Sequence, residues 1–147
     1  DLEITGHPTV TLLVTSSTAD GHFFVYLESI DPDGRVRLLT EGQLRALHRK
    51  VSTDRPPYTF FGPYHSLKAK DAQLLKPDEM TEISFDLLPL SVRFTKGQRL
   101  RIAIAGADKD TFAPLQDSCD QRITIERNRI HASCIDLPTI PAAGEKP

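Results

Sequence analysis

An alternation of apolar and polar side chains marks two segments of the chain, residues 81–87 and 99–105. The apolar members recur at every second position: Ile83, Phe85, Leu87, Leu100, Ile102 and Ile104. A period of two places alternate side chains on one face of a β-strand, so both segments are predicted to be strands with one buried face. We expect Phe85 and Ile102 to be core residues on facing or neighbouring strands. A sheet with one buried face needs a second layer, which the rest of the chain must supply.

Five further segments have the composition of strands. They are rich in Val, Ile, Leu, Thr and Phe: residues 9–15, 23–30, 36–40, 123–125 and 130–137. Asp31-Pro32-Asp33-Gly34 is typical of a β-turn, and it would join two of these strands as a hairpin. In a second turn, Thr95-Lys96-Gly97-Gln98, the glycine can supply a positive φ. Short strands at this spacing favour an all-β sandwich or jelly roll.

Residues 43–50 fit two periods. Leu44 and Leu47 suit a helix, whereas Leu44, Ala46 and His48 would form one face of a strand. Eight residues cannot decide between the two by pattern alone, so both remain open at this point.

Residues 51–76 form a long irregular passage that contains an aromatic cluster. Four of the ten Tyr and Phe residues gather there: Tyr58, Phe60, Phe61 and Tyr64. Buried, these rings would hold the loop against the sandwich; exposed, they would offer a contact patch to a partner or ligand. The residues alone leave both interpretations open. An irregular segment of this length in a compact domain is usually functional or mobile.

Candidate catalytic and metal-binding residues are few. The chain contains no Gly-x-Ser-x-Gly nucleophile motif, and the adjacent pair His65-Ser66 has no evident orienting carboxylate. The five histidines are scattered without a zinc spacing. Four aspartates could gather around calcium, but a solvated loop is the favoured interpretation: Asp108, Asp110, Asp117 and Asp120. We therefore assign no catalytic residue, metal or cofactor to this chain.

Length, charge and composition narrow the class of protein further. The 147 residues suffice for one domain, and the net charge of −2 gives no case for binding nucleic acid or an anionic membrane. No apolar run approaches the ~20 residues of a membrane span. Cys119 and Cys134 are expected to be reduced thiols rather than a disulfide. Because Met80 is the only methionine, we expect residues 1–147 to be one domain cut from a longer protein, with a tail at 138–147.

The order of these signals resembles the C-terminal domain of the X-Pro dipeptidyl-peptidase and cocaine esterase family. The resemblance covers nearly the whole chain. It is carried by short motifs in a fixed order: Ile4-Thr5-Gly6, Thr15-Ser16-Ser17, Asp31-Pro32-Asp33-Gly34, Leu39-Thr40-Glu41-Gly42-Gln43-Leu44-Arg45-Ala46, Leu75-Lys76-Pro77-Asp78-Glu79, Gly97-Gln98-Arg99-Leu100-Arg101, Asn128-Arg129-Ile130-His131 and Leu137-Pro138. Each motif alone is weak, and their number and order give the match its specificity.

The resemblance implies a jelly-roll β-sandwich of the galactose-binding-domain-like kind, with Gln43–Arg49 as a strand. It also implies that the catalytic Ser, Asp and His lie in a preceding α/β-hydrolase domain of the same parent chain. The sandwich would pack on that domain and help to wall the substrate cleft. The family's first strands would precede Asp1, so we expect an incomplete sandwich with an open edge.

The resemblance also gives the aromatic loop a role. Residues 51–76 are longer than in the cocaine esterase type, so we interpret them as an insertion. Five side chains of the insertion are expected to face a partner domain or substrate: Tyr58, Phe60, Phe61, Tyr64 and His65. Two other classes stay open. A free-standing carbohydrate-binding module is disfavoured by the absence of Trp, and a homo-oligomerisation module is not excluded.

Overall fold

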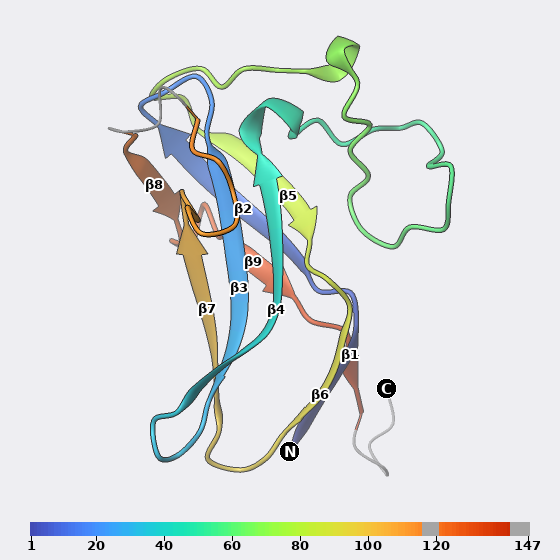
Figure 1. The fold of residues 1–147 in the computed structure, drawn as a ribbon, viewed down its shortest axis with the longest axis vertical. Helices are drawn as coiled ribbons and strands as arrows, with labels where there is room; N and C mark the ends of the chain where they lie inside the picture. The colour runs from blue at the N-terminus through green and yellow to red at the C-terminus, as the bar shows by residue number, and fades with distance from the viewer. Residues whose placement is uncertain (116–120, 142–147) are drawn as a thin grey trace.

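The computed structural model describes residues 1–115 and 121–141, and this part of the chain is almost entirely β (Figure 1). Its strands and short 3-10 helices are β1 (Leu2–Gly6), β2 (Thr9–Ser16), β3 (His22–Ile30), β4 (Val36–Arg45), η1 (Ala46–His48), η2 (Ala69–Asp71), β5 (Thr81–Asp86), β6 (Leu90–Phe94), β7 (Arg99–Ala105), β8 (Ile123–Glu126), β9 (Cys134–Asp136) and β10 (Thr139–Ile140). The prediction of an all-β sandwich is confirmed.

One layer of the sandwich is a three-stranded antiparallel sheet in the order β4-β3-β7. Its central hairpin, β3–β4, closes through the predicted turn, where the Gly34 amide donates to the Asp31 carbonyl at 2.9 Å. Gly34 has φ 85°, a left-handed conformation that glycine adopts without a steric penalty. A register shift between Leu27 and Glu28 interrupts the pairing with β4.

The other layer is built around a long antiparallel ribbon. β1 pairs with β6 and β2 pairs with β5, and each long arm is interrupted near a proline, Pro8 in one and Pro89 in the other. β8 and β9 pair with the opposite edge of β2, and β10 pairs with β1. The expected tail therefore begins with a short strand, Thr139–Ile140.

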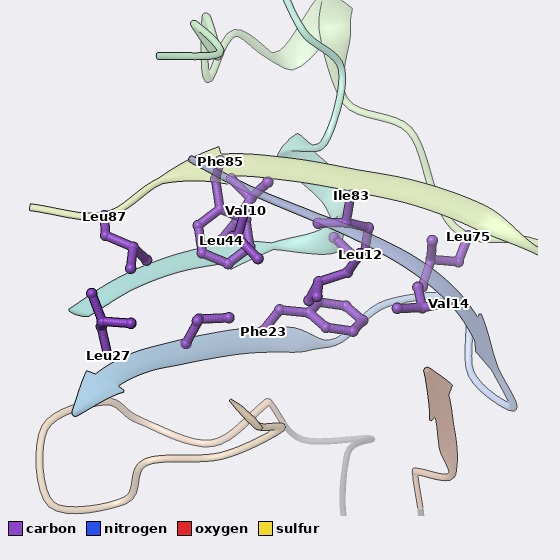
Figure 2. Packing of buried hydrophobic residues seen from close by; sticks show 12 residues of the cluster. Val10, Leu12, Val14, Phe23, Leu27, Leu44, Leu75, Ile83, Phe85 and Leu87 are labelled. Atoms are coloured by element: carbon purple, nitrogen blue, oxygen red, sulfur yellow. The ribbon is translucent and has the colours of Figure 1, made fainter. Parts of the chain in front are cut away.

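The hydrophobic core lies between the two layers (Figure 2). Val10, Leu12 and Val14 point inward from β2, and the predicted inward face of β5 is buried as expected. Phe85 is 2% exposed and lies opposite Val10 in the register of β2 and β5. Phe23 and Leu27 of β3 point toward this layer and pack in the same core.

The prediction that Ile102 is a core residue is wrong, since 40% of it is exposed. Its direction was nevertheless inferred correctly. Ile102 pairs with Leu27, which is fully buried, so both lie on the core face of the sheet. Ile102 remains exposed because β7 is the end strand of its sheet within the described residues, and the opposite layer does not extend over it.

The ambiguous segment at residues 43–50 is divided between two structures. It continues β4 through Arg45 and then turns as the 3-10 helix Ala46–His48, so the strand implied through Arg49 is wrong beyond Arg45. The turn has tertiary causes. The Ala46 amide donates to the Gly21 carbonyl at 2.8 Å, and the Leu47 amide donates to the carboxylate of Asp20 at 3.1 Å.

Candidate functional site

The loop at residues 51–76, drawn in green, projects beside β5 (Figure 1). Hydrogen bonds between residues 50–52 and residues 64–71 hold the base of the loop together. The Ser52 amide donates to the Tyr64 carbonyl at 2.7 Å, and this bond joins the two ends of the segment that forms the tip of the loop. Lys50 pairs with Asp71, and the Ser66 hydroxyl donates to the same carboxylate at 2.6 Å. Both bonds hold the pKa of Asp71 below its ordinary value, because they favour the charged carboxylate.

Two side chains connect this base to the sandwich. The His65 ring lies between two backbone carbonyl oxygens, 3.1 Å from that of Lys50 and 2.9 Å from that of Ser84 in β5. The Arg49 guanidinium donates to the carbonyls of Gln73 and Leu74 at the other end of the loop. The loop is therefore anchored to the sandwich at both ends, although it contains only one short 3-10 turn.

The aromatic cluster occupies the tip. Phe60 contacts Tyr58 and Tyr64 with edge-on rings, both at centroid distances of 6.0 Å. Phe61 points another way and lies 5.2 Å from the ring of His7. Tyr58 is 60% exposed and Phe61 is 74% exposed, whereas Phe60 and Tyr64 are half-buried. The tip thus combines rings that support one another with rings that face solvent.

The neighbours His65 and Ser66 do not form a nucleophile and base pair. Ser66 donates its hydroxyl hydrogen to Asp71, and both nitrogens of His65 face backbone carbonyls. Within residues 1–115 and 121–141, no cluster of three or more His, Cys, Asp or Glu side chains is arranged to hold a metal ion. Of the four aspartates considered for calcium, Asp117 and Asp120 lie outside the described residues, as does Cys119. Asp108 accepts a hydrogen bond from the hydroxyl of Tyr26 at 2.7 Å.

A second candidate surface, not predicted from the sequence, lies on the outer face of the β4-β3-β7 sheet. A groove of about 210 Å³ is lined there by His22, Phe24, Arg45, Leu67 and Phe112, among others. Phe24 is buried because the ring of Phe112 covers it at 5.0 Å. Burial, and then the charge of Arg45, lower the pKa of His22. Strands β3 and β4 build this groove together with residues of two loops far apart in sequence, so no local pattern could have indicated it.

These observations define an all-β sandwich that carries an anchored loop with an aromatic tip. The described residues also contain no helix long and apolar enough to cross a membrane. Residues 1–133 match the family described as the X-Pro dipeptidyl-peptidase C-terminal non-catalytic domain. The chain belongs to this family, as its sequence motifs predict.

Similar proteins agree with this assignment. A putative serine esterase of Mycobacterium tuberculosis is 53% identical over 139 residues, which is 95% of this chain and 22% of that protein. The cocaine esterase of a Rhodococcus species is 26% identical over 151 residues, covering 95% of this chain and 23% of that protein. A CocE/NonD family hydrolase from Staphylococcus aureus has a similar fold, with a TM-score of 0.74 and 18% identity; the match covers 95% of this chain and 28% of that one. The chain thus spans less than a third of the length of these relatives.

Proposed function

We propose that this chain is the non-catalytic C-terminal domain of a serine acyl hydrolase. In this proposal it packs on an α/β-hydrolase domain of the same parent chain and helps to wall the substrate cleft. The parent would cleave an ester or amide through an acyl-enzyme intermediate formed on its own serine. The relatives support this proposal, since they include a putative serine esterase and a cocaine esterase that are much longer than this chain.

The observation that carries the role in the cleft is the combination of an anchored base and an exposed aromatic tip. Free loops lose conformational entropy when they bind, and this cost is smaller when the loop is already fixed. Here the Ser52–Tyr64 hydrogen bond and the His65 contacts fix the base. Tyr58 and Phe61 then present large apolar surfaces to solvent. Aromatic side chains of this kind often dominate the energy of a contact between proteins.

The neighbouring rings have a supporting role in this proposal. Phe60 and Tyr64 pack on one another, and they would keep Tyr58 in place when the loop meets the hydrolase domain. His65 would position the tip by holding the loop against β5, and it would not act as an acid or base. Every side chain that contacts the reacting atoms of the substrate would belong to the hydrolase domain.

The test compares one double variant in two contexts. Tyr58→Ser with Phe61→Ser is made in the 147-residue chain and in the parent protein, with the exposed Ile130→Ser as the matched control. The melting temperature of the short chain should change little, because both rings are largely in solvent. In the parent, the double variant should raise KM several-fold or increase proteolysis between the domains, whereas Ile130→Ser should do neither.

Two results would contradict the proposal. If the double variant unfolds the short chain, the rings are structural and their exposure has been misjudged. If the parent keeps its KM and its resistance to proteolysis, the loop does not contact the hydrolase domain. A fluorophosphonate probe gives a separate check, since the short chain should remain unlabelled while the parent labels at one serine.

A further inference from the structure

The groove on the outer face of the β4-β3-β7 sheet contains none of the aromatic tip residues of the loop. It has a volume of about 210 Å³ and lies over paired residues of β3 and β4. His22 pairs there with Arg45, and Phe24 pairs with Gln43. Phe23 lies in the hydrophobic core, and successive side chains of a strand point to opposite faces. His22 and Phe24 therefore point outward into the groove.

The floor of the groove is a row of aromatic rings. Phe24 contacts two other rings, that of His22 edge-on at 5.6 Å and that of Phe112 at 5.0 Å. Phe112 follows β7, and its amide donates to the Asp108 carbonyl at 2.8 Å. The hydroxyl of Tyr26 in β3 donates to the carboxylate of the same aspartate. These bonds tie the segment that carries Phe112 to the sheet, so the apolar floor is already formed.

Leu67 forms a wall of the groove from the base of the loop. Its φ is 54°, a left-handed conformation that is strained for a bulky side chain. The neighbouring residues hold this conformation: the Ser66 hydroxyl accepts from the Lys68 amide at 3.2 Å and donates to Asp71 at 2.6 Å. Leu67 is nevertheless 64% exposed, so its own burial does not offset the strain. Such strain gathers at ligand-binding sites, and contact with a ligand would give this side chain a role.

The polar side chains of the groove make its potential positive. They are His22, Gln43, Arg45 and His48, and no acidic side chain is among the described residues that line it. Arg45 forms an ion pair with Asp20 at 2.7 Å. Burial lowers the pKa of His22, and the charge of Arg45 then lowers it more than the charge of Asp20 raises it. The positive charge of Arg45 therefore prevails at this end of the groove.

We propose that the groove binds a small molecule that carries a carboxylate on an apolar group. The apolar group would lie against Phe24, Phe112 and Leu67. The carboxylate would face the guanidinium of Arg45 and the side-chain amide of Gln43. A cavity of about 150 Å³ holds benzene, so the apolar group would have about six to nine carbons.

Size and charge favour a small ligand over a protein partner. A stable protein interface buries about 800 Å² on each side, whereas a groove of 210 Å³ accommodates little more than one side chain. Pockets for drug-sized ligands begin at about 300 Å³, so the ligand is also smaller than these. The charge of Arg45 complements a carboxylate and would repel an ammonium group.

This inference does not rest on the proposed function. Every residue that lines the groove belongs to this chain, and the aromatic tip contributes none of them. The test measures binding to the 147-residue chain and uses no enzyme activity. The site and the role of the aromatic tip can therefore fail separately.

The first experiment titrates the isotope-labelled chain with sodium octanoate and follows the backbone amides by NMR. The amides of residues 22–24, 43–45 and 67 should shift along one saturating curve, with a Kd of about 1 mM or lower. Octylammonium has the same alkyl chain and the opposite charge, and it should bind at least about tenfold more weakly. Butyrate should also bind at least about tenfold more weakly, because its short chain cannot cover the aromatic floor.

Three results of this titration would overturn the proposal. The first is the absence of saturation by about 10 mM octanoate. The second is equal binding of octanoate and octylammonium, which would show that the positive end of the groove does not select the ligand. The third is a shift of the same amides with protein concentration when octanoate is absent, which would assign this face to a second copy of the chain.

A first variant tests the strained wall. Leu67→Asn removes the apolar side chain and places a residue that tolerates a left-handed backbone. It should weaken octanoate binding by at least about fivefold without lowering the melting temperature. Leu74→Asn is the matched control, because Leu74 belongs to the same loop, is 60% exposed and does not line the groove. Equal octanoate affinities of the two variants would refute the assignment of Leu67.

A second variant tests the charge of the groove without disturbing the fold. Gln43→Glu adds a carboxylate at an exposed position of the groove. It should weaken octanoate binding by about tenfold and strengthen octylammonium binding. Arg45 is left unchanged, because its removal would deprive the Asp20 carboxylate of its ion pair. If Gln43→Glu binds both probes as the unmodified chain does, the carboxylate does not lie at this end and the proposal fails.

Discussion

Replacing Phe85 with alanine tests whether the core lies where the two layers meet. The ring comes from β5 and is 2% exposed. It lies beside Val10 of the same layer and faces Leu44 of the other, so side chains from both sheets surround it (Figure 2). Other core side chains of both layers remain in contact when the ring is removed, so the layers cannot move together to fill the cavity.

The expected loss of stability is large because the cavity stays open. Removal of a buried aromatic ring costs the lost transfer free energy together with the free energy of the cavity, about 3–5 kcal/mol in all. Domains of this kind are stabilised by about 5–15 kcal/mol in total, so the loss is a large fraction. Phe61→Ala is the control, because this ring is 74% exposed. Its removal should cost less than about 1 kcal/mol, which is the size of one ring contact.

Urea unfolding followed by far-UV circular dichroism measures the difference, since the chain has no Trp for a fluorescence assay. With a denaturant slope of about 2 kcal/mol/M, the midpoint for Phe85→Ala should fall by roughly 1.5–2.5 M. The midpoint for Phe61→Ala should fall by less than about 0.5 M. If the two variants lose stability equally, the assignment of the inward face of β5 is refuted.

Two further predictions concern Gly42 of β4 and the half-buried hydroxyl of Tyr26. Gly42→Ala should destabilise the chain by about 1–3 kcal/mol in the same assay, because the new methyl group would overlap a backbone oxygen of Asp86. An unchanged midpoint would mean that β4 does not approach the backbone of Asp86 closely at Gly42. Burial, and then the hydrogen bond to Asp108, raise the pKa of Tyr26 from 10.0 to about 12. The raised pKa stabilises the folded state fully below pH 10, and this contribution is lost as the pH rises toward 12. Tyr26→Phe should remove that alkaline loss of stability, and a variant that keeps the same pH dependence would contradict the assignment.

The period of the apolar residues predicted strand directions well and burial less well. On β5 the alternating residues are buried as expected, because β2 and the opposite sheet cover them. On β7 the same period gave the correct face, yet Ile102 is exposed. Periodicity is a local property that fixes which way a side chain points. Burial also depends on whether a strand from elsewhere lies over that side chain, and the sequence of β7 does not carry this information.

The aromatic tip could be identified from composition, whereas its anchors could not. His65 and Arg49 fix the loop through backbone carbonyls of Ser84, Gln73 and their neighbours. Every residue carries a carbonyl, so such acceptors leave no mark in a sequence. The 3-10 turn after Arg45 was hidden for a related reason, since its hydrogen bonds reach to Asp20 and Gly21. Tertiary partners decided a segment whose own pattern fitted both a helix and a strand.

The long antiparallel ribbon has a consequence for the order of events during synthesis. β2 leaves the ribosome before its partners: its neighbour β5 follows about seventy residues later, and β9 follows later still. At about 5–20 residues per second, β2 waits roughly 4–15 s for the first of these partners. The β3–β4 hairpin needs only its own turn and can form meanwhile. Val10, Leu12 and Val14 must therefore remain without their sheet partners until β5 has been synthesised.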